Sequence, residues 1–225
     1  MRLDIALVEQ RITATRSRAK RAITMGLVSV DGTIITKPSK HIGYHNKIMT
    51  MENIDVPEGY MKLKNIQNQS SLLHHDDMVL DLGSSAGGFL LYSCEIVDHV
   101  RGIEYSVEFI PQLQTIAATH KNITVIKGDV FTMPLQVMSN QDADVIMSDL
   151  TVEPEDAIIV LARVLPLLKP GGRILQVLKI SKNTDQNVLI NKIQALGFTI
   201  QHIIRPKKRE IYVIAQHNMN SEVVE

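Results

Sequence analysis

Four charged residues that lie far apart in the chain have types suited to one reactive site. They are Lys62, Asp149, Lys179 and Glu210. An ammonium group beside carboxylates can stabilise the anion that develops on a weakly acidic hydroxyl. It can also accept the hydroxyl proton near neutral pH if its pKa, ordinarily ~10.4, falls by roughly 2–3 units. The residue types leave both roles open for a lysine.

From Met61 onward, strand-like segments alternate with helix-like segments. Strands separated by helices of about 10–15 residues predict a mostly parallel sheet with helices on both faces. A short link joins the last two strands, so we expect the final strand to run antiparallel. Asp149, Lys179 and Glu210 should then converge at the sheet edge where such folds bind ligands. We predict seven strands near residues 78–83, 99–104, 123–127, 144–149, 173–180, 198–204 and 210–216.

The same four residues also have ordinary explanations. Taken singly, Lys62 and Glu210 are more often surface charges, and Asp149 can cap a turn. Lys179 is harder to explain in this way, because a lysine that ends an apolar strand is rarely buried without a partner. Four such residues at compatible strand ends favour a shared site.

A turn of small residues follows the first of these strands, in Gly83-Ser84-Ser85-Ala86-Gly87-Gly88. Small residues let the backbone approach a ligand where the next helix begins. Glu104 ends the second strand and can accept both hydroxyls of a ribose, while Asp129 follows the third and can meet an adenine amine. Lys169-Pro170-Gly171-Gly172 precedes the fifth strand. The turn lacks the Gly-x-Gly-x-x-Gly spacing of dinucleotide-binding dehydrogenases.

This ordered set of motifs resembles class I S-adenosylmethionine-dependent methyltransferases. The resemblance implies a Rossmann-like α/β fold with a seven-stranded, mostly parallel sheet, and S-adenosyl-L-methionine as the cofactor. The residues that it assigns to cofactor binding are Asp81, Gly83, Ser84, Ser85, Gly87, Gly88, Phe89, Glu104, Asp129 and Val130.

The four charged residues resemble the Lys-Asp-Lys-Glu tetrad of FtsJ-like ribose 2′-O-methyltransferases. FtsJ has Pro in place of Ala86 and a shorter spacing before its second lysine, whereas TlyA-type, hemolysin-like rRNA methyltransferases share the longer spacing. The resemblance implies that Lys179 orients or deprotonates a ribose 2′-hydroxyl, with Asp149 beside the donor. Lys62 and Glu210 would position the nucleotide and tune Lys179. Residues 151–154 match neither family closely, and we expect them to contact the substrate.

The N-terminal segment is basic, although the whole chain has 24 Lys and Arg against 24 Asp and Glu. Lys and Arg that neutralise phosphates supply most non-specific affinity for nucleic acids. A charge cluster alone is equally typical of a solvated helix face. The eight basic residues of positions 1–40 are Arg2, Arg11, Arg16, Arg18, Lys20, Arg21, Lys37 and Lys40.

This segment also has the pattern of two short helices and a hairpin. Thr15 or Ser17 can cap the second helix, Gly26 ends it, and Asp31-Gly32 predicts a tight turn between short strands. The segment resembles the S-four (alpha-L) RNA-binding domain, a small α+β domain, which implies that it docks on structured RNA. The predicted divisions are an RNA-binding domain at 1–45, a linker at 46–60, a methyltransferase domain at 61–216 and a tail at 217–225.

Other classes of protein are disfavoured. The single cysteine, Cys94, excludes an internal disulfide framework, and the histidines lack metal-site spacing, so no metal is expected. No signal peptide or membrane-spanning segment is recognisable, so we expect a cytoplasmic protein with RNA as partner, most simply rRNA or a ribosomal subunit. The alternative is a non-catalytic RNA-binding or ribosome-assembly factor with the same fold. A membrane-active lysin is disfavoured by the lack of a spanning segment and of Trp.

Overall fold

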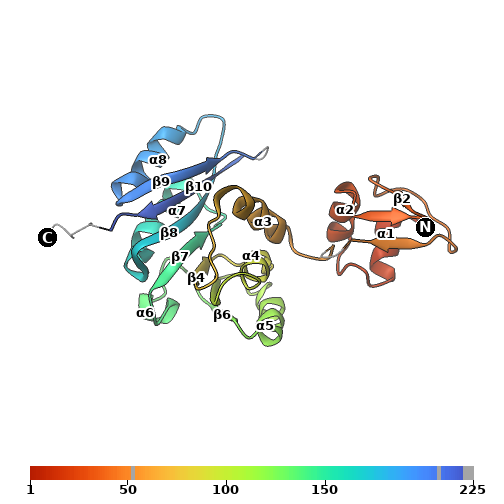
Figure 1. Cartoon of the computed structure of the whole chain (residues 1–225), viewed down its shortest axis with the longest axis horizontal. Helices are drawn as coiled ribbons and strands as arrows, with labels where there is room; N and C mark the ends of the chain where they lie inside the picture. Colours follow the sequence, from red (N-terminus) through yellow and green to blue (C-terminus); the bar gives the residue numbers. More distant parts are fainter. Residues whose placement is uncertain (52–53, 207–208, 220–225) are drawn as a thin grey trace. The chain divides into compact units, whose positions relative to one another are not determined.

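The computed structural model describes residues 1–51, 54–206 and 209–219. The chain divides into two compact units, Met1–Glu58 and Gly59–Glu225 (Figure 1). Residues 220–225 of the predicted tail lie outside the described residues. In the described part of the chain, no helix is both long and apolar enough to cross a membrane.

The first unit contains the predicted pair of helices and the hairpin. Helix α2 starts after Thr15, whose side chain accepts a hydrogen bond from the Arg18 backbone N–H at 3.3 Å. Asp31 and Gly32 both have positive φ, as a tight hairpin turn requires. The elements are α1 (Leu3–Glu9), α2 (Arg16–Thr24), β1 (Val28–Val30), β2 (Thr33–Ile34) and β3 (Ile48–Thr50), with the strands in the order β2-β1-β3.

Part of the predicted 46–60 linker is folded into this unit. Strand β3 pairs antiparallel with β1, and Ile54 is buried in the core of the unit at 6% exposure. The strand has only three residues, which is too short for an alternating pattern to stand out in the sequence. Its pairing with β1 depends on the tertiary fold.

The second unit contains a seven-stranded sheet in the order β6-β5-β4-β7-β8-β10-β9. The predicted strands are confirmed, and β10 runs antiparallel to both β8 and β9 while the other pairings are parallel. Strand β8 begins at Leu168 rather than near residue 173, so it includes the Gly171-Gly172 pair. The strands are β4 (Met78–Leu82), β5 (His99–Glu104), β6 (Ile123–Lys127), β7 (Ala143–Ser148), β8 (Leu168–Lys179), β9 (Phe198–Ile204) and β10 (Glu210–His217).

The strand order creates the place where a ligand can bind. The chain runs outward from β4 to β5 and β6, then returns to β7 on the other side of β4. The loops after β4 and β7 therefore diverge, and a crevice opens at the carboxyl ends of these strands. The helices are α3 (Glu58–Ser70), α4 (Gly88–Ser93), α5 (Ile110–Thr119), α6 (Leu135–Met138), α7 (Pro154–Val164) and α8 (Gln186–Ala195), with a 3₁₀ turn at Leu165–Leu167.

Helix α3 is fixed against α4 at its first turn. A Cβ added to Gly88 would lie 2.5 Å from the Tyr60 backbone nitrogen and 2.7 Å from the Gly59 Cα. The Tyr60 ring packs edge-on against Tyr92, with centroids 5.2 Å apart. The Tyr60 hydroxyl donates to Glu95 at 2.7 Å. Because Lys62 lies two residues further along α3, this contact determines where its side chain begins.

Gly88→Ala is therefore expected to destabilise the protein in the absence of any ligand. The added methyl group must push α4 away from α3, and such overpacking costs about 1–3 kcal/mol. Urea unfolding of the purified wild-type protein and the variant measures the difference. An unchanged unfolding midpoint would show that the glycine is not required for helix packing.

Candidate active site

Lys62, Asp149, Lys179 and Glu210 form a closed ring of alternating charge. The Lys62 ammonium lies 2.7 Å from an Asp149 oxygen and 3.0 Å from a Glu210 oxygen. The Lys179 ammonium lies 2.8 Å from the other Asp149 oxygen and 3.0 Å from the other Glu210 oxygen. Each cation thus contacts both carboxylates. The structure brings all four predicted residues together.

Four different elements supply the ring. Lys179 ends β8 and is the direct register partner of Glu210, the first residue of β10. Asp149 follows β7, the parallel neighbour of β8, and Lys62 reaches the ring from α3. The Lys62 ammonium also lies 4.8 Å from the centroid of the Tyr212 ring. An antiparallel β10 is what allows a strand start and two strand ends to meet.

The ring is partly buried, which sets its protonation state. Side-chain exposure ranges from 14% for Lys62 to 31% for Lys179. Desolvation lowers the pKa of Lys179, but hydrogen bonds and attraction from Asp149 and Glu210 outweigh it, so the pKa is raised above its ordinary value. Desolvation raises the pKa of Glu210, but the two lysines outweigh it and lower that pKa to about 2. Lys179 is therefore an ammonium ion at neutral pH.

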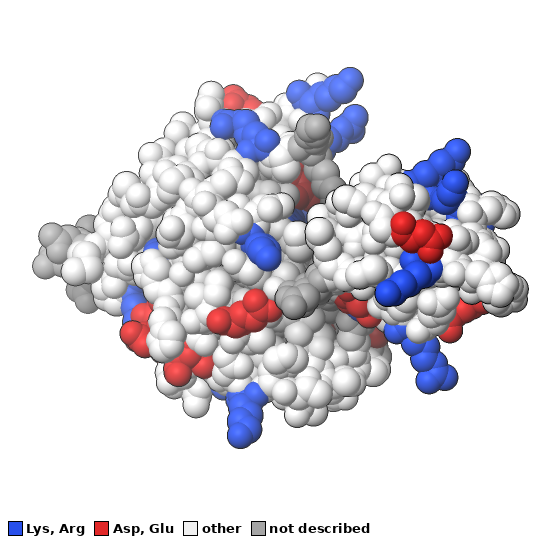
Figure 2. All heavy atoms as spheres, turned by 45° about the vertical axis from the view of Figure 1, so that its right-hand side comes forward, with Lys and Arg blue, Asp and Glu red and all other residues white. Residues whose placement is uncertain are grey.

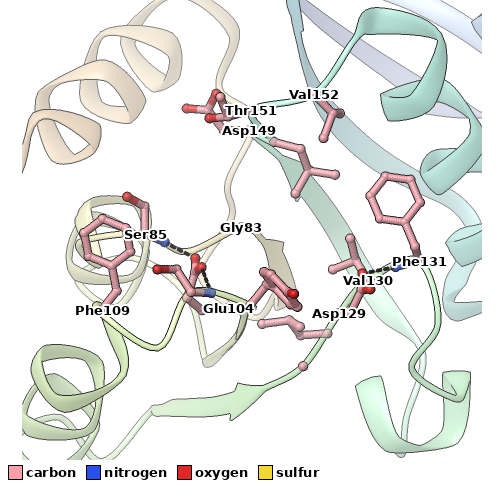
Figure 3. A pocket seen from close by; sticks show the side chains of 15 residues that line it. Gly83, Ser85, Glu104, Phe109, Asp129, Val130, Phe131, Asp149, Thr151 and Val152 are labelled. Atoms are coloured by element: carbon pink, nitrogen blue, oxygen red, sulfur yellow. Dashed lines mark hydrogen bonds between the residues drawn. The ribbon is translucent and has the colours of Figure 1, made fainter.

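A pocket of about 430 Å³ opens next to the ring, among the loops that follow β4, β5, β6 and β7. Figure 3 shows how its side chains face one another. The lining residues are Gly83, Ser85, Ile103, Glu104, Tyr105, Ser106, Phe109, Gly128, Asp129, Val130, Phe131, Asp149, Leu150, Thr151 and Val152. Asp149 belongs both to this lining and to the charged ring, so the two sites are continuous.

Two carboxylates in the pocket are held by backbone N–H groups. Glu104 accepts from the Ser85 and Ser106 backbone nitrogens, both at 2.6 Å, and Asp129 accepts from the Phe131 nitrogen at 2.9 Å (Figure 3). Glu104 is only 7% exposed, so its orientation is fixed. Carboxylates with free lone pairs beside aromatic side chains fit an adenosyl group, which presents ribose hydroxyls and an amine next to a flat ring.

The predicted cofactor residues divide into two groups. Gly83, Ser85, Glu104, Asp129 and Val130 line the pocket. The other predicted residues are outside this lining and support the turn beneath it. They are Asp81, Ser84, Gly87, Gly88 and Phe89.

The supporting group has clear structural roles. The Ser84 hydroxyl donates to the buried Asp81 carboxylate at 2.7 Å. Gly87 has a φ of 81°, and a Cβ there would lie 2.5 Å from the Ile116 side chain. Packing and backbone conformation therefore account for Gly87, in addition to any approach of a ligand.

The sequence prediction omitted several pocket residues that follow directly after strand ends. Tyr105 comes after Glu104, and Phe131 comes two residues after Asp129; they are 72% and 39% exposed. An exposed aromatic residue next to a strand-end carboxylate is the sequence signal that could have identified both. Thr151 and Val152 line the pocket within the segment 151–154 that we expected to contact substrate.

Asp81 lies at the base of the site as a third carboxylate. Its side chain is 1% exposed, and burial raises its pKa to about 7, with the hydrogen bond from Ser84 opposing and the charges of Asp149 and Glu104 adding to the increase. Among the described residues, no group of three or more His, Cys, Asp and Glu is arranged to hold a metal ion.

The basic residues predicted to bind RNA are partly used within the first unit. Arg2 and Arg16 both bind the buried Asp4 carboxylate at 2.9 Å, and the Arg2 hydrogen bond is the main reason that the pKa of Asp4 falls to about 2. Arg18 binds Asp55, and Arg21 donates to the Val56 carbonyl. The remaining four are exposed, with no ion pair recorded among the described residues: Arg11, Lys20, Lys37 and Lys40.

Two family models match the chain. The model described as FtsJ-like methyltransferase matches residues 56–218, and the S4 domain model matches residues 1–45. The first covers well over half of the chain and includes all four residues of the charged ring.

Individual proteins resemble the chain over different lengths. The rRNA methyltransferase YqxC of Bacillus subtilis (strain 168) is 34% identical over 39% of this chain. The matched segment spans only 32% of the length of that relative. The ribosomal RNA large subunit methyltransferase E of Desulfatibacillum aliphaticivorans is 29% identical over 68% of this chain and 80% of its own. A solved structure described as a hemolysin from Streptococcus thermophilus has a TM-score of 0.60 and 16% identity, covering 97% of this chain and 88% of its own. This last likeness concerns the fold.

The buried Asp81 should make stability depend on pH. The folded protein keeps the Asp81 proton up to about pH 7, whereas an unfolded aspartate loses it near 3.8. The folded state therefore binds more protons between these values, and stability falls as pH rises through 7. Asp81→Asn should reduce this fall between pH 5 and pH 8, by roughly 3 kcal/mol at most. Urea unfolding at both pH values measures it, with the exposed Asp98→Asn as control; equal slopes for the two variants would contradict the assignment.

Proposed function

Because the chain belongs to the FtsJ-like methyltransferase family, we propose that it methylates a ribose 2′-hydroxyl of ribosomal RNA, with S-adenosylmethionine as the donor. The observation that carries the proposal is that Asp149 belongs to both the pocket and the charged ring. A donor in the pocket and an acceptor at the ring would then meet at one residue. The relatives named as rRNA methyltransferases support rRNA as the substrate.

The pocket residues hold the donor in this proposal. Glu104 would accept hydrogen bonds from the ribose hydroxyls of the adenosyl group, and Asp129 would accept one from its amine. Tyr105 and Phe131 would lie beside the adenine. S-adenosylmethionine supplies a methyl group already activated on a sulfonium. The protein therefore needs mainly to align donor and acceptor and to exclude water.

The charged ring handles the acceptor. Lys179 is protonated near neutral pH, so it acts by donating a hydrogen bond to the acceptor oxygen, which aligns another lone pair of that oxygen with the methyl carbon. Asp149 and Glu210 hold Lys179 in place, and Lys62, which pairs with both carboxylates, would position the nucleotide together with Glu210. The hydroxyl keeps its proton until the new C–O bond forms, when the oxygen becomes strongly acidic and the proton passes to water. Lys179 thus orients the hydroxyl without being a free base.

The first unit provides the docking function. Residues 1–45 match the S4 domain model, and Arg11, Lys20, Lys37 and Lys40 expose positive charge that is available to phosphates. With rRNA as the substrate, the cytoplasm is the proposed place of the reaction. The RNA-binding roles of the individual basic residues stay predictions.

Lys179→Ala should abolish methyl transfer while leaving both ligands bound. Loss of the group that contacts the acceptor oxygen should reduce kcat by roughly 10²-fold or more. The affinities for S-adenosylmethionine, measured by calorimetry, and for RNA should stay within about threefold, since other residues make most of those contacts. Transfer of labelled methyl groups to in vitro transcribed rRNA, followed by mass spectrometry of the nucleosides, gives the rate and the modified atom.

Lys192→Ala, on the exposed surface of α8, is the matched control for loss of a lysine. Normal turnover by Lys179→Ala would contradict the role of this residue. Failure of the wild-type protein to bind S-adenosylmethionine, with or without rRNA, would instead favour a non-catalytic RNA-binding factor.

The pH dependence of the wild-type reaction should distinguish an ammonium from a free base at position 179. If Lys179 acted as a base with its pKa raised above 10.5, the uncharged fraction would grow tenfold for each pH unit below that pKa. A plot of log kcat/KM against pH would then rise with a slope of one. An ammonium that orients the hydroxyl gives a plateau instead. We expect kcat/KM to change less than about twofold between pH 7 and pH 9. If the logarithm of the single-turnover rate constant rises with pH with a slope near one, Lys179 acts as a base and its assignment as an ammonium group is wrong.

A further inference from the structure

Three exposed cations lie at the same end of the sheet as the charged ring. They are Lys182, Arg205 and Arg209, which we call the basic rim. Lys182 lies in the loop between β8 and α8, and the two arginines lie between β9 and β10. None of them belongs to the ring or to the pocket lining.

Backbone and side-chain contacts fix the rim beside the ring. The Ile180 N–H donates to the Arg209 carbonyl at 3.0 Å, which continues the pairing of Lys179 with Glu210 by one residue. Arg205 follows the end of β9, and its Nε donates to the Gln186 side chain at 3.2 Å. Gln186 is the first residue of α8, the helix that follows the Lys182 loop. The rim thus extends from the end of β8 to the end of β9, at one end of the sheet.

The rim is positively charged, whereas the unit that carries it has a small excess of acidic residues. Residues 59–225 contain 15 Lys and Arg against 18 Asp and Glu. The acidic neighbours of the rim are engaged elsewhere: Asp185 accepts from the Asn187 backbone nitrogen, and Glu210 contacts two lysines of the ring. No ion pair is recorded for the three rim cations among the described residues. Figure 2 shows Lys and Arg side chains gathered at an edge of the larger unit.

We propose that the basic rim binds backbone phosphates of the RNA next to the acceptor nucleotide. The inference rests on the proposed function, because a ribose at Lys179 carries its own neighbouring phosphates past the end of β8. Arginine presents several N–H donors in a fixed fork that matches phosphate oxygens. With Nε of Arg205 held by Gln186, its terminal NH₂ groups remain for such a contact. The methyltransferase unit therefore has an RNA contact of its own, separate from residues 1–45.

The test uses the full-length protein and in vitro transcribed, unmodified rRNA. The Arg205→Ala/Arg209→Ala variant should raise the KM for RNA on the order of tenfold or more, with little change in the affinity for S-adenosylmethionine. The dependence of log affinity on log salt should also become shallower, by roughly 0.7 for each phosphate that the variant no longer neutralises. Lys121→Ala is the control, because this exposed lysine precedes β6 at the opposite edge of the sheet.

Direct binding separates this inference from the proposed function. A wild-type salt dependence in the double variant would overturn the rim as a phosphate site, even if methylation proceeds normally. A shallower dependence in the double variant, but not in Lys121→Ala, supports the rim whether or not methylation is detected. Loss of S-adenosylmethionine binding together with RNA binding would indicate misfolding; Arg205→Lys/Arg209→Lys, which keeps the charge, then decides the matter by restoring or not restoring the wild-type salt dependence.

Discussion

The electrostatic ring of Lys62, Asp149, Lys179 and Glu210 is the constraint on which the site depends. Each of its side chains is less than one-third exposed, so removing one partner leaves a poorly solvated charge without compensation. The ring closes only if β7 and β8 are parallel and β10 runs the other way. Strand order, strand direction and the position of α3 must therefore all be correct before the four charges can meet.

The same ring also decides the chemistry. A lysine serves as a base at neutral pH when burial lowers its pKa without nearby anions. Lys179 is half-buried, but two carboxylates at 2.8 and 3.0 Å reverse the effect of burial. The arrangement keeps the proton on the lysine, and it suits a reaction in which the leaving group is already activated and the acceptor needs orientation more than deprotonation.

Much of this arrangement could be predicted from the sequence, because strand ends in a doubly wound sheet meet at a known edge. Asp149, Lys179 and Glu210 were expected to converge for that reason. Lys62 could be assigned only through the family resemblance, since its position depends on the close contact of Gly88 with the start of α3. Strand β3 gave no signal for a related reason: its pairing partner is about 20 residues away, and three residues carry no period.

Basic residues make different contacts in the two units, and this affects how an RNA can be held. In the first unit Arg2, Arg16 and Arg18 contact carboxylates, so these arginines stabilise the fold and have fewer donors left for phosphate. In-line transfer requires the acceptor oxygen to lie within about 3–3.5 Å of the methyl carbon. A contact made only by the first unit would restrain that oxygen indirectly, through the RNA that joins the docked segment to the acceptor nucleotide. In our proposal the cations of the basic rim restrain it more directly, because they lie at the same end of the sheet as Lys179 and bind the phosphates next to the acceptor ribose.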